Sequence, residues 1–405
     1  MKRILIYTEN YEAGGGNKYM VDIINSIPEG INLVIASNKN GVYKNDFSSI
    51  KRPYSYYPLN VKTFVNLLSK LEITKTQNLI ISIFKQLLFL FIIPYYKFYN
   101  SILFKRILKK EKPNLVLSCN GGFPAALSCL DLVNTSFNLK ISVILSVVSL
   151  PQIKKKWLAI FYPNICSRIT HLLVNSSKTK ENFISYYDFN PNIITIVYNS
   201  IEIKKIEIYS EISENEILQY KNKNEILIGY IGRIDKMKGI QFLIDSFYKL
   251  TNELQNVRLI LVGKGDDYDR IKSHIYKLGL SDKIITTGYY HGNIRDLLQI
   301  IDIFAFPSLW EGFPYSILEA MECEKLIVST DVGSIPEAIK DNENGFLTEP
   351  GNTIKLFETL KKAVINYNSY EHIRKRARET IIQRFNQPRF SDEINSLIKP
   401  YLLKQ

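Results

Sequence analysis

The stretch from Glu225 to Leu243, EILIGYIGRIDKMKGIQFL, contains the pattern that decides the fold. After Glu225, residues 226–231 form an apolar run, which is typical of a strand buried on both faces of a parallel sheet. Beyond Gly232, apolar residues recur at helical spacing and predict one buried stripe: Ile240, Leu243, Ile244, Phe247 and Leu250. A buried strand, a glycine turn and an amphipathic helix form the repeating unit of a doubly wound α/β sheet.

Similar apolar runs recur along the whole chain. We predict strands at 3–8, 32–37, 114–118, 141–148, 171–176 and 193–198 in the first half, and at 225–231, 257–263, 283–288, 303–308 and 326–330 in the second. Two such sets predict two Rossmann-like domains, 1–203 and 204–385, that bind ligands at the carboxyl ends of their strands. The polar run 204–216 is the expected joint.

Composition limits the class of protein. The chain has 405 residues, of which 46% are hydrophobic and 22% charged, as in globular proteins with full cores. Its four cysteines, Cys119, Cys129, Cys166 and Cys323, form no CxxC pair, so neither a metal site nor a disulfide framework is expected. The apolar run after Met1 is too short for a signal peptide, which predicts a cytoplasmic location.

The charge of the chain is one-sided. Residues 1–200 contain 24 Lys and Arg against 10 Asp and Glu, whereas residues 201–405 contain 28 against 29. A basic first half predicts attraction to phosphate-rich partners such as anionic lipid, although a lysine-biased composition that only keeps the protein soluble gives the same count. Nucleic acid is not favoured, because no basic repeat or known module accompanies the charge.

Residues 76–104 depart from the alternating pattern. Between Thr76 and Tyr96 the only charged residue is Lys85, and the basic run KRILKKEK begins at Lys105. A segment lying in a membrane interface fits apolar residues flanked by lysines and tyrosines. A core helix and a membrane span remain alternatives, although Lys85 and Pro94 would interrupt a span.

The loop after the strand at 225–231 is a candidate anion site. Arg233 and Lys238 flank a turn that opens a helix, where free N–H groups and the helix dipole favour negative charge. A diphosphate suits such a site, and two solvated basic residues on a turn are the alternative. The stretch lacks the GxGxxG spacing of a dinucleotide site.

Two glutamates bracket a Gly-Phe-Pro turn in LWEGFPYSILEA, residues 309–320. Paired carboxylates are typical of glycosidases. Pro314, however, fits the first position of a helix, in which the N–H groups of Tyr315, Ser316 and Ile317 have no intrahelical partners. Glu311 then precedes the helix and Glu319 lies in its second turn, so the two carboxylates would bind hydroxyls on different parts of one elongated ligand. Two surface glutamates beside a turn remain an alternative.

These segments resemble family 4 of the glycosyltransferases. EGFPYSILE, from Glu311 to Glu319, resembles the E-x7-E motif of the family, and the stretch at 228–247 resembles its VGRL...KG segment. LILVGKGDDYDRIK resembles the family's VGxG strand end, and 288–308 resembles a further segment between the two motifs. The GGG at 14–16 is a weaker match.

The resemblance implies a GT-B fold, in which two Rossmann-like domains face across a cleft, and metal-independent, retaining transfer from a nucleotide-sugar without a bound cofactor. It implies that Arg233 and Lys238 bind the donor diphosphate, that Glu311 binds the donor sugar and that Glu319 binds the ribose. Backbone at the remaining donor-binding positions would approach the donor: Gly15, Gly16, Gly232, Gly263, Gly265, Gly312, Phe313, Pro314, Tyr315, Ser316 and Ile317. The closing segment 386–405 would pack on the N-terminal domain.

The chain also departs from the family pattern. Many members carry a histidine after the fourth strand of the N-terminal domain, but the corresponding stretch here, ILSVVSLPQIKKKW, has none. The sequence therefore does not identify a general base. The expected function is transfer of a hexose-type sugar, with a UDP-sugar favoured as donor, to a lipid-linked glycan acceptor in bacterial surface polysaccharide synthesis at the inner face of the membrane. A non-catalytic partner subunit is the main alternative, and a glycosidase or phosphorylase is a further one.

Overall fold

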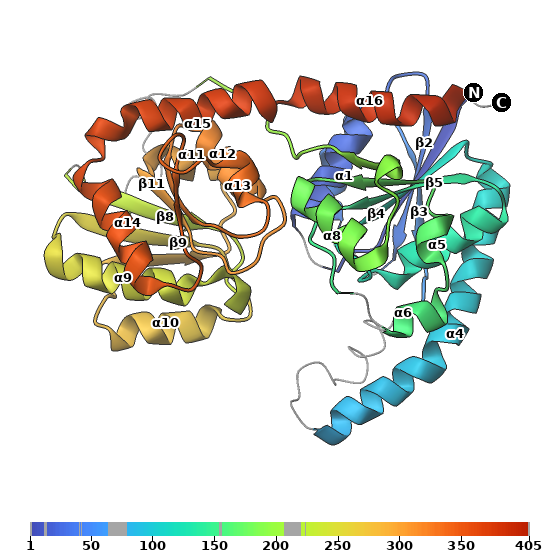
Figure 1. Ribbon diagram of the computed structural model, residues 1–405, viewed down its shortest axis with the longest axis horizontal. Helices are drawn as coiled ribbons and strands as arrows, with labels where there is room; N and C mark the ends of the chain where they lie inside the picture. The colour runs from blue at the N-terminus through green and yellow to red at the C-terminus, as the bar shows by residue number, and fades with distance from the viewer. Residues whose placement is uncertain are drawn as a thin grey trace. The chain divides into compact units, whose positions relative to one another are not determined.

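The computed structural model describes residues 2–11, 14–39, 41, 43–63, 79–153, 156–205, 220–222 and 224–403. The chain divides into two compact units, shown in Figure 1. The first comprises Met1–Tyr198 with Phe390–Gln405, and the second comprises Asn199–Arg389. Most of the expected joint at 204–216 lies outside the described residues.

The first unit is built on a parallel sheet of seven strands in the order β3-β2-β1-β4-β5-β6-β7. The strands are β1 (Arg3–Thr8), β2 (Asn32–Asn38), β3 (Ser55–Leu59), β4 (Leu115–Asn120), β5 (Ser142–Val147), β6 (His171–Val174) and β7 (Ile194–Ile196). Helices cover both faces of the sheet (Figure 1), which explains why its central strands are continuous apolar runs. They are α1 (Gly15–Ser26), α2 (Lys44–Ser48), α4 (Leu79–Glu111), α5 (Leu127–Asn138), α6 (Lys156–Phe161), α7 (Ile165–Arg168) and α8 (Ser177–Tyr187).

The second unit repeats the design with six parallel strands in the order β10-β9-β8-β11-β12-β13. The strands are β8 (Ile226–Ile231), β9 (Val257–Val262), β10 (Ile284–Gly288), β11 (Ile303–Phe306), β12 (Leu326–Thr330) and β13 (Phe346–Thr348). The helices are α9 (Ile240–Glu253), α10 (Tyr268–Lys277), α11 (Ile294–Ile300), α12 (Tyr315–Glu322), α13 (Ile335–Ala338), α14 (Thr353–Ile365) and α15 (Glu371–Arg384). All five positions of the apolar stripe predicted at 240–250 are buried in α9.

The last helix, α16 (Gln387–Leu403), belongs mostly to the first unit. The ring of Phe390 packs edge-on against Tyr19 of α1, with 5.3 Å between ring centroids. The hydroxyl of Ser391 lies 2.9 Å from that of Ser26, also on α1.

Two strands of the structure differ from the sequence predictions. The edge strands β3 and β13 were not predicted, because β3 is largely exposed and contains Pro58 whereas β13 has only three residues. Proline is tolerated at a sheet edge, where its missing N–H is not needed. α4 continues through Pro94, which lies on the exposed side of the helix.

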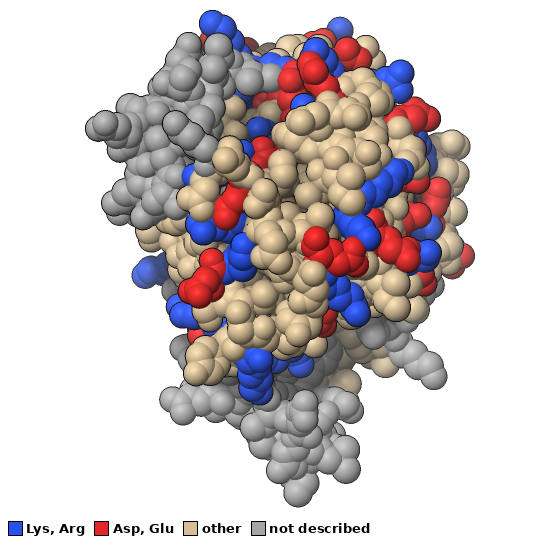
Figure 2. Space-filling model, turned by 90° about the vertical axis from the view of Figure 1, so that its left-hand side faces the viewer, with Lys and Arg blue, Asp and Glu red and all other residues tan. Residues whose placement is uncertain are grey.

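Charges are distributed as the sequence predicts for the second half. On the face shown in Figure 2, which is the left-hand side of Figure 1, basic and acidic side chains are interspersed.

No helix among the described residues is long and apolar enough to cross a membrane. Part of the segment 76–104 lies outside the described residues, namely 76–78 and the side chains of 79–87 and 89.

Candidate active site

The candidate site of the second unit lies where its strand order reverses. β8 pairs with β9 on one side and with β11 on the other, and the chain continues from β8 to β9 but from β11 to β12, in opposite directions across the sheet. Doubly wound sheets bind ligands at this point. The loop after β8 carries Arg233 and Lys238, and the loop after β11 carries Glu311.

Asp235 organises the loop after β8. Its side chain accepts a hydrogen bond from the backbone N–H of Met237 (2.9 Å) and so caps the short 3-10 helix Lys236–Lys238. The same carboxylate binds Nε of Arg233 at 2.7 Å. Because the Arg233 side chain is 57% exposed, its guanidinium stays within reach of a ligand in solution.

The loops after β8 and β11 are in direct contact. The N–H of Leu309 donates to the carbonyl of Met237 at 2.8 Å. Gly239 has a φ of 62°, and a Cβ at this position would lie 2.1 Å from the carbonyl oxygen of Pro307. Only glycine allows this approach, so Gly239 holds Lys238 against the neighbouring loop.

Lys238 and Glu311 form a largely buried ion pair. Nζ of Lys238 lies 2.5 Å from Oε1 of Glu311, and the hydroxyl of Ser308 donates to the same oxygen at 2.7 Å. Glu311 is only 7% exposed. A carboxylate in such a place needs these partners to offset its lost hydration. The structure thus brings together two residues that the sequence analysis assigned to different parts of a ligand.

The helix after Glu311 begins one residue later than predicted. Pro314 has extended backbone angles and occupies the N-cap, so the first helical residue of α12 is Tyr315. The prediction of Pro314 at the first helical position is therefore wrong by one residue, because its ψ of 127° is not helical. Ser316 and Glu319 are both partly exposed and lie one turn apart on one face of α12.

Other predicted donor-binding side chains lie in the core. Phe313 is 4% exposed and packs against Phe385 at 5.3 Å between ring centroids, while its carbonyl accepts a 2.5 Å bond from Nδ2 of Asn199. Tyr315 and Ile317 are buried as well. These three residues could therefore meet a ligand only through their backbone. Gly312 is partly exposed, and its carbonyl accepts the N–H of Ser334 at 3.3 Å.

The predicted glycines after β8 and β9 contact each other. A Cβ on Gly263, whose φ is 130°, would lie 1.9 Å from the carbonyl oxygen of Gly232. A Cβ on Gly265 would lie 2.3 Å from the carbonyl oxygen of Ile234. Close packing of the two loops thus already explains why glycine occupies these positions.

The remaining two predicted residues, Gly15 and Gly16, belong to the first unit. They are the first residues of α1, and Gly15 is exposed. A Cβ on Gly16 would lie 3.5 Å from Cα of Gly121, which follows β4. The turn therefore lies at the carboxyl ends of β1 and β4, where the strand order of the first sheet reverses.

A buried carboxyl group at this end of the first sheet was not predicted. Glu9 directly follows β1, is 6% exposed and accepts hydrogen bonds from the backbone N–H (3.2 Å) and the hydroxyl of Ser128. Burial raises its pKa to about 7, and burial also raises the pKa of Asp131 to about 6. The signal in the sequence was a glutamate directly after a buried strand.

The burial of Glu9 predicts a pH-dependent stability. Its folded pKa of about 7 lies above its unfolded value, so the folded protein retains a proton that the unfolded chain loses. Stability is then highest below the unfolded pKa and falls as pH rises through the folded pKa, by about 3 kcal/mol for this group. We expect Glu9→Gln to flatten the decline of Tm between about pH 5 and pH 8. Exposed Glu29→Gln is the control, and equal curves for wild type and Glu9→Gln would refute this account.

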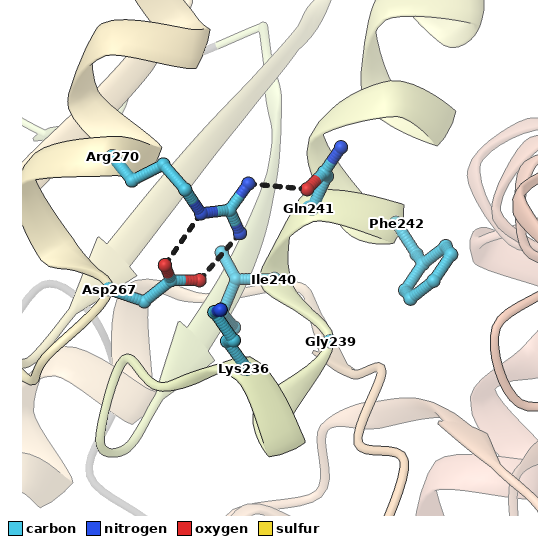
Figure 3. Close-up of a pocket in the computed structure, with 7 residues that line it drawn as sticks. All are labelled: Lys236, Gly239, Ile240, Gln241, Phe242, Asp267 and Arg270. Atoms are coloured by element: carbon cyan, nitrogen blue, oxygen red, sulfur yellow. Dashed lines mark hydrogen bonds and ion pairs between the residues drawn. The ribbon is translucent and has the colours of Figure 1, made fainter. Parts of the chain in front are cut away.

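A separate hollow of about 350 Å³ lies beside the loop after β8 (Figure 3). In it the guanidinium of Arg270 points toward Asp267, with two bonds of 2.6 Å, and toward Gln241 at 2.5 Å. Neither Lys238 nor Glu311 lines this hollow. Asp267 pairs with Arg270 there, so this hollow is distinct from the Lys238–Glu311 pair.

Potential metal ligands are scattered. Among the residues that the structure describes, no group of three or more His, Cys, Asp or Glu side chains could hold a metal ion. Cys119, Cys129 and Cys323 are buried, and no disulfide joins any of the four described cysteines.

Comparison with known proteins places these features in a family. The model of "Glycosyl transferases group 1" matches residues 213–380, and that of "Glycosyltransferase Family 4" matches residues 68–205. The crystal structure of Anabaena Alr3699/HepE in complex with UDP has a TM-score of 0.76 at 19% identity, covering 99% of this chain and 100% of that one. The fold is therefore GT-B, as predicted, and the chain belongs to the family 4 glycosyltransferases.

The matches to curated relatives cover only part of each protein. The capsular polysaccharide biosynthesis glycosyltransferase CapM of Staphylococcus aureus is 25% identical over 59% of this chain and 61% of its own length. An N-acetylgalactosaminyltransferase of Campylobacter jejuni, whose name gives a diphospho-undecaprenol acceptor, is 26% identical over 52% of this chain and 53% of its own length. The chain thus matches about three fifths or less of the length of these relatives.

Proposed function

We propose that the protein is a retaining, metal-independent glycosyltransferase. It moves a hexose-type sugar from a nucleotide-sugar, with UDP favoured, to a lipid-linked glycan in bacterial surface polysaccharide synthesis. The observation that carries the proposal is the ion pair of Lys238 and Glu311 at the point where the second sheet reverses its strand order.

The chemistry explains why this pair matters. When the bond between the sugar and the diphosphate breaks, negative charge develops on the departing phosphate oxygen. Arg233 and Lys238 supply fixed positive charge at the end of β8, which stabilises that oxygen without reorganisation. Glu311, held by Lys238 and Ser308, then accepts hydrogen bonds from the donor sugar, and Glu319 accepts those of the ribose hydroxyls.

The two units would divide the substrates. We assign donor binding to residues 204–385, and acceptor binding to residues 1–203 together with the closing segment 386–405. Support for a lipid-linked acceptor comes from the name of the Campylobacter relative, and support for UDP comes from the Anabaena structure. A protein that meets lipid-linked acceptors would work at the inner face of the cell membrane.

A transfer assay tests this proposal. The purified protein is incubated with UDP-sugars and a bacterial lipid extract, and UDP release and the anomeric configuration of the product are followed by NMR. We expect retained configuration and the same rate with and without a metal chelator. Inverted product or loss of activity in the chelator would contradict the proposed mechanism, and nucleotide binding without transfer would favour the non-catalytic partner subunit.

A further inference from the structure

α4 carries an exposed apolar stripe on one face. Four large side chains recur along it at intervals of three and four residues, so they share one side of the helix. They are Phe91 (80% exposed), Tyr95 (58%), Phe98 (67%) and Ile102 (38%). We call these four residues the α4 stripe. An apolar row of this size on a surface helix indicates a contact surface.

The opposite face of α4 fixes the direction in which the stripe points. Phe104 is fully buried and meets Tyr7 of β1 edge-on, at 4.9 Å between ring centroids. Nδ2 of Asn100 donates to Oδ2 of Asp131 on α5 at 2.8 Å and to the carbonyl of Lys62 at 2.9 Å. A rotation of α4 would break these contacts, so the stripe is held on the exposed side of the helix. The helix itself lies at the outside of the first unit in Figure 1.

Positively charged side chains lie on the same face of α4, beyond the α4 stripe. Lys105, Arg106 and Lys109 follow the stripe at helical spacing, and all three are exposed. From Leu79 to Lys110 the helix contains no Asp or Glu, in contrast to the mixed charges of the surface in Figure 2. An aromatic and aliphatic row that ends in a cluster of cations fits the boundary between acyl chains and anionic head groups.

We propose that the α4 stripe and the cations after it dock the protein on an anionic lipid bilayer. The rings of Phe91, Tyr95 and Phe98 enter the interface, and Lys105, Arg106 and Lys109 contact lipid phosphates. This proposal shares with the proposed function only the location at a membrane. Docking through α4 does not depend on whether the protein transfers a sugar. It also gives the interfacial interpretation of the segment 76–104 a specific set of side chains.

Vesicle sedimentation tests the surface, with phosphatidylcholine vesicles that either contain or lack phosphatidylglycerol. We expect wild type to bind the anionic vesicles more tightly. Phe91→Ser/Phe98→Ser should weaken binding by at least about tenfold. Lys105→Ser/Arg106→Ser should weaken binding to the anionic vesicles roughly twentyfold and should affect binding to the other vesicles less.

The matched control is Tyr276→Ser/Ile365→Ser in the second unit, which removes two similarly exposed apolar side chains (79% and 58%). It should bind as wild type does. The proposal is overturned if wild type binds neither vesicle, if Phe91→Ser/Phe98→Ser binds like wild type, or if the control loses as much. It is also overturned if wild type is a dimer without lipid and Phe91→Ser/Phe98→Ser is a monomer, because the stripe would then be a subunit interface.

A local probe shows which surface touches the bilayer. Phe98→Trp should shift its fluorescence to shorter wavelength on anionic vesicles, whereas Tyr276→Trp should not. The reverse pattern would place the contact elsewhere and refute the proposal. Melting curves with UDP, measured on the same variants, keep loss of membrane binding distinct from loss of the donor site.

Discussion

Lys238→Ala is expected to lower turnover by about 100- to 1000-fold while the protein stays folded. The side chain supplies charge that is worth most when the departing phosphate becomes negative, so the loss should fall on kcat more than on KM. The measurement is steady-state transfer from a UDP-sugar. The matched control is Lys236→Ala, an exposed lysine two residues away in the same short helix. A wild-type rate for Lys238→Ala would refute the assignment.

Because Lys238 is paired with Glu311, Lys238→Ala is expected to change stability as well as turnover. A double variant separates the two effects. Removing Lys238 leaves a buried carboxylate with only the Ser308 hydroxyl among the contacts described above, which costs stability on its own. Lys238→Ala/Glu311→Gln removes that unpaired charge. We expect the double variant to recover stability without recovering turnover. Recovery of both would show that Lys238 acts only as a structural partner of Glu311.

Glu322→Ala is expected to destabilise the protein by about 3–5 kcal/mol. Glu322 of α12 is 1% exposed and bonds Arg295 and Arg378, the latter at 2.9 Å. It also accepts the backbone N–H of Lys204 at 3.0 Å, near the start of the second unit. Removing the carboxylate would leave two largely buried guanidinium groups without this partner.

Urea unfolding measures this loss. The control is Glu324→Ala, because the Glu324 carboxylate is 32% exposed and lies 3.9 Å from Nε of Arg378. The control should change stability by no more than about 0.5 kcal/mol. If the two variants were equally stable, the buried ion pairs around Glu322 would not hold α12 as described.

Much of the fold could be predicted from the sequence, because helices cover both faces of each sheet and make the central strands continuous apolar runs. The edge strands β3 and β13 were not predicted, because β3 is largely exposed and β13 is short, so their hydrophobic pattern is weaker. The rotation of α4 about its axis could not be predicted either, because apolar residues are spread around the helix and the tertiary contacts of Asn100 and Phe104 select the buried face.

The sequence predicts which residues form the candidate site but not how they are arranged in space. Lys238 and Glu311 are 73 residues apart in sequence, and they meet only because β8 and β11 are neighbours. Local pattern carries no information on such a pair. The burial of Glu9 was missed for a similar reason, because a single carboxyl group after a strand looks the same whether it ends in solvent or under a helix.

The most direct test of the account is thermal unfolding in the presence of UDP, GDP, ADP or CMP. A nucleotide at about 100 times its Kd should stabilise the wild type by about 2.7 kcal/mol. We predict that UDP does so, and that Glu319→Ala, which removes the proposed ribose contact, loses most of the effect. If no nucleotide shifts the melting curve at millimolar concentration, or if Glu319→Ala responds as wild type does, the proposed donor site is wrong.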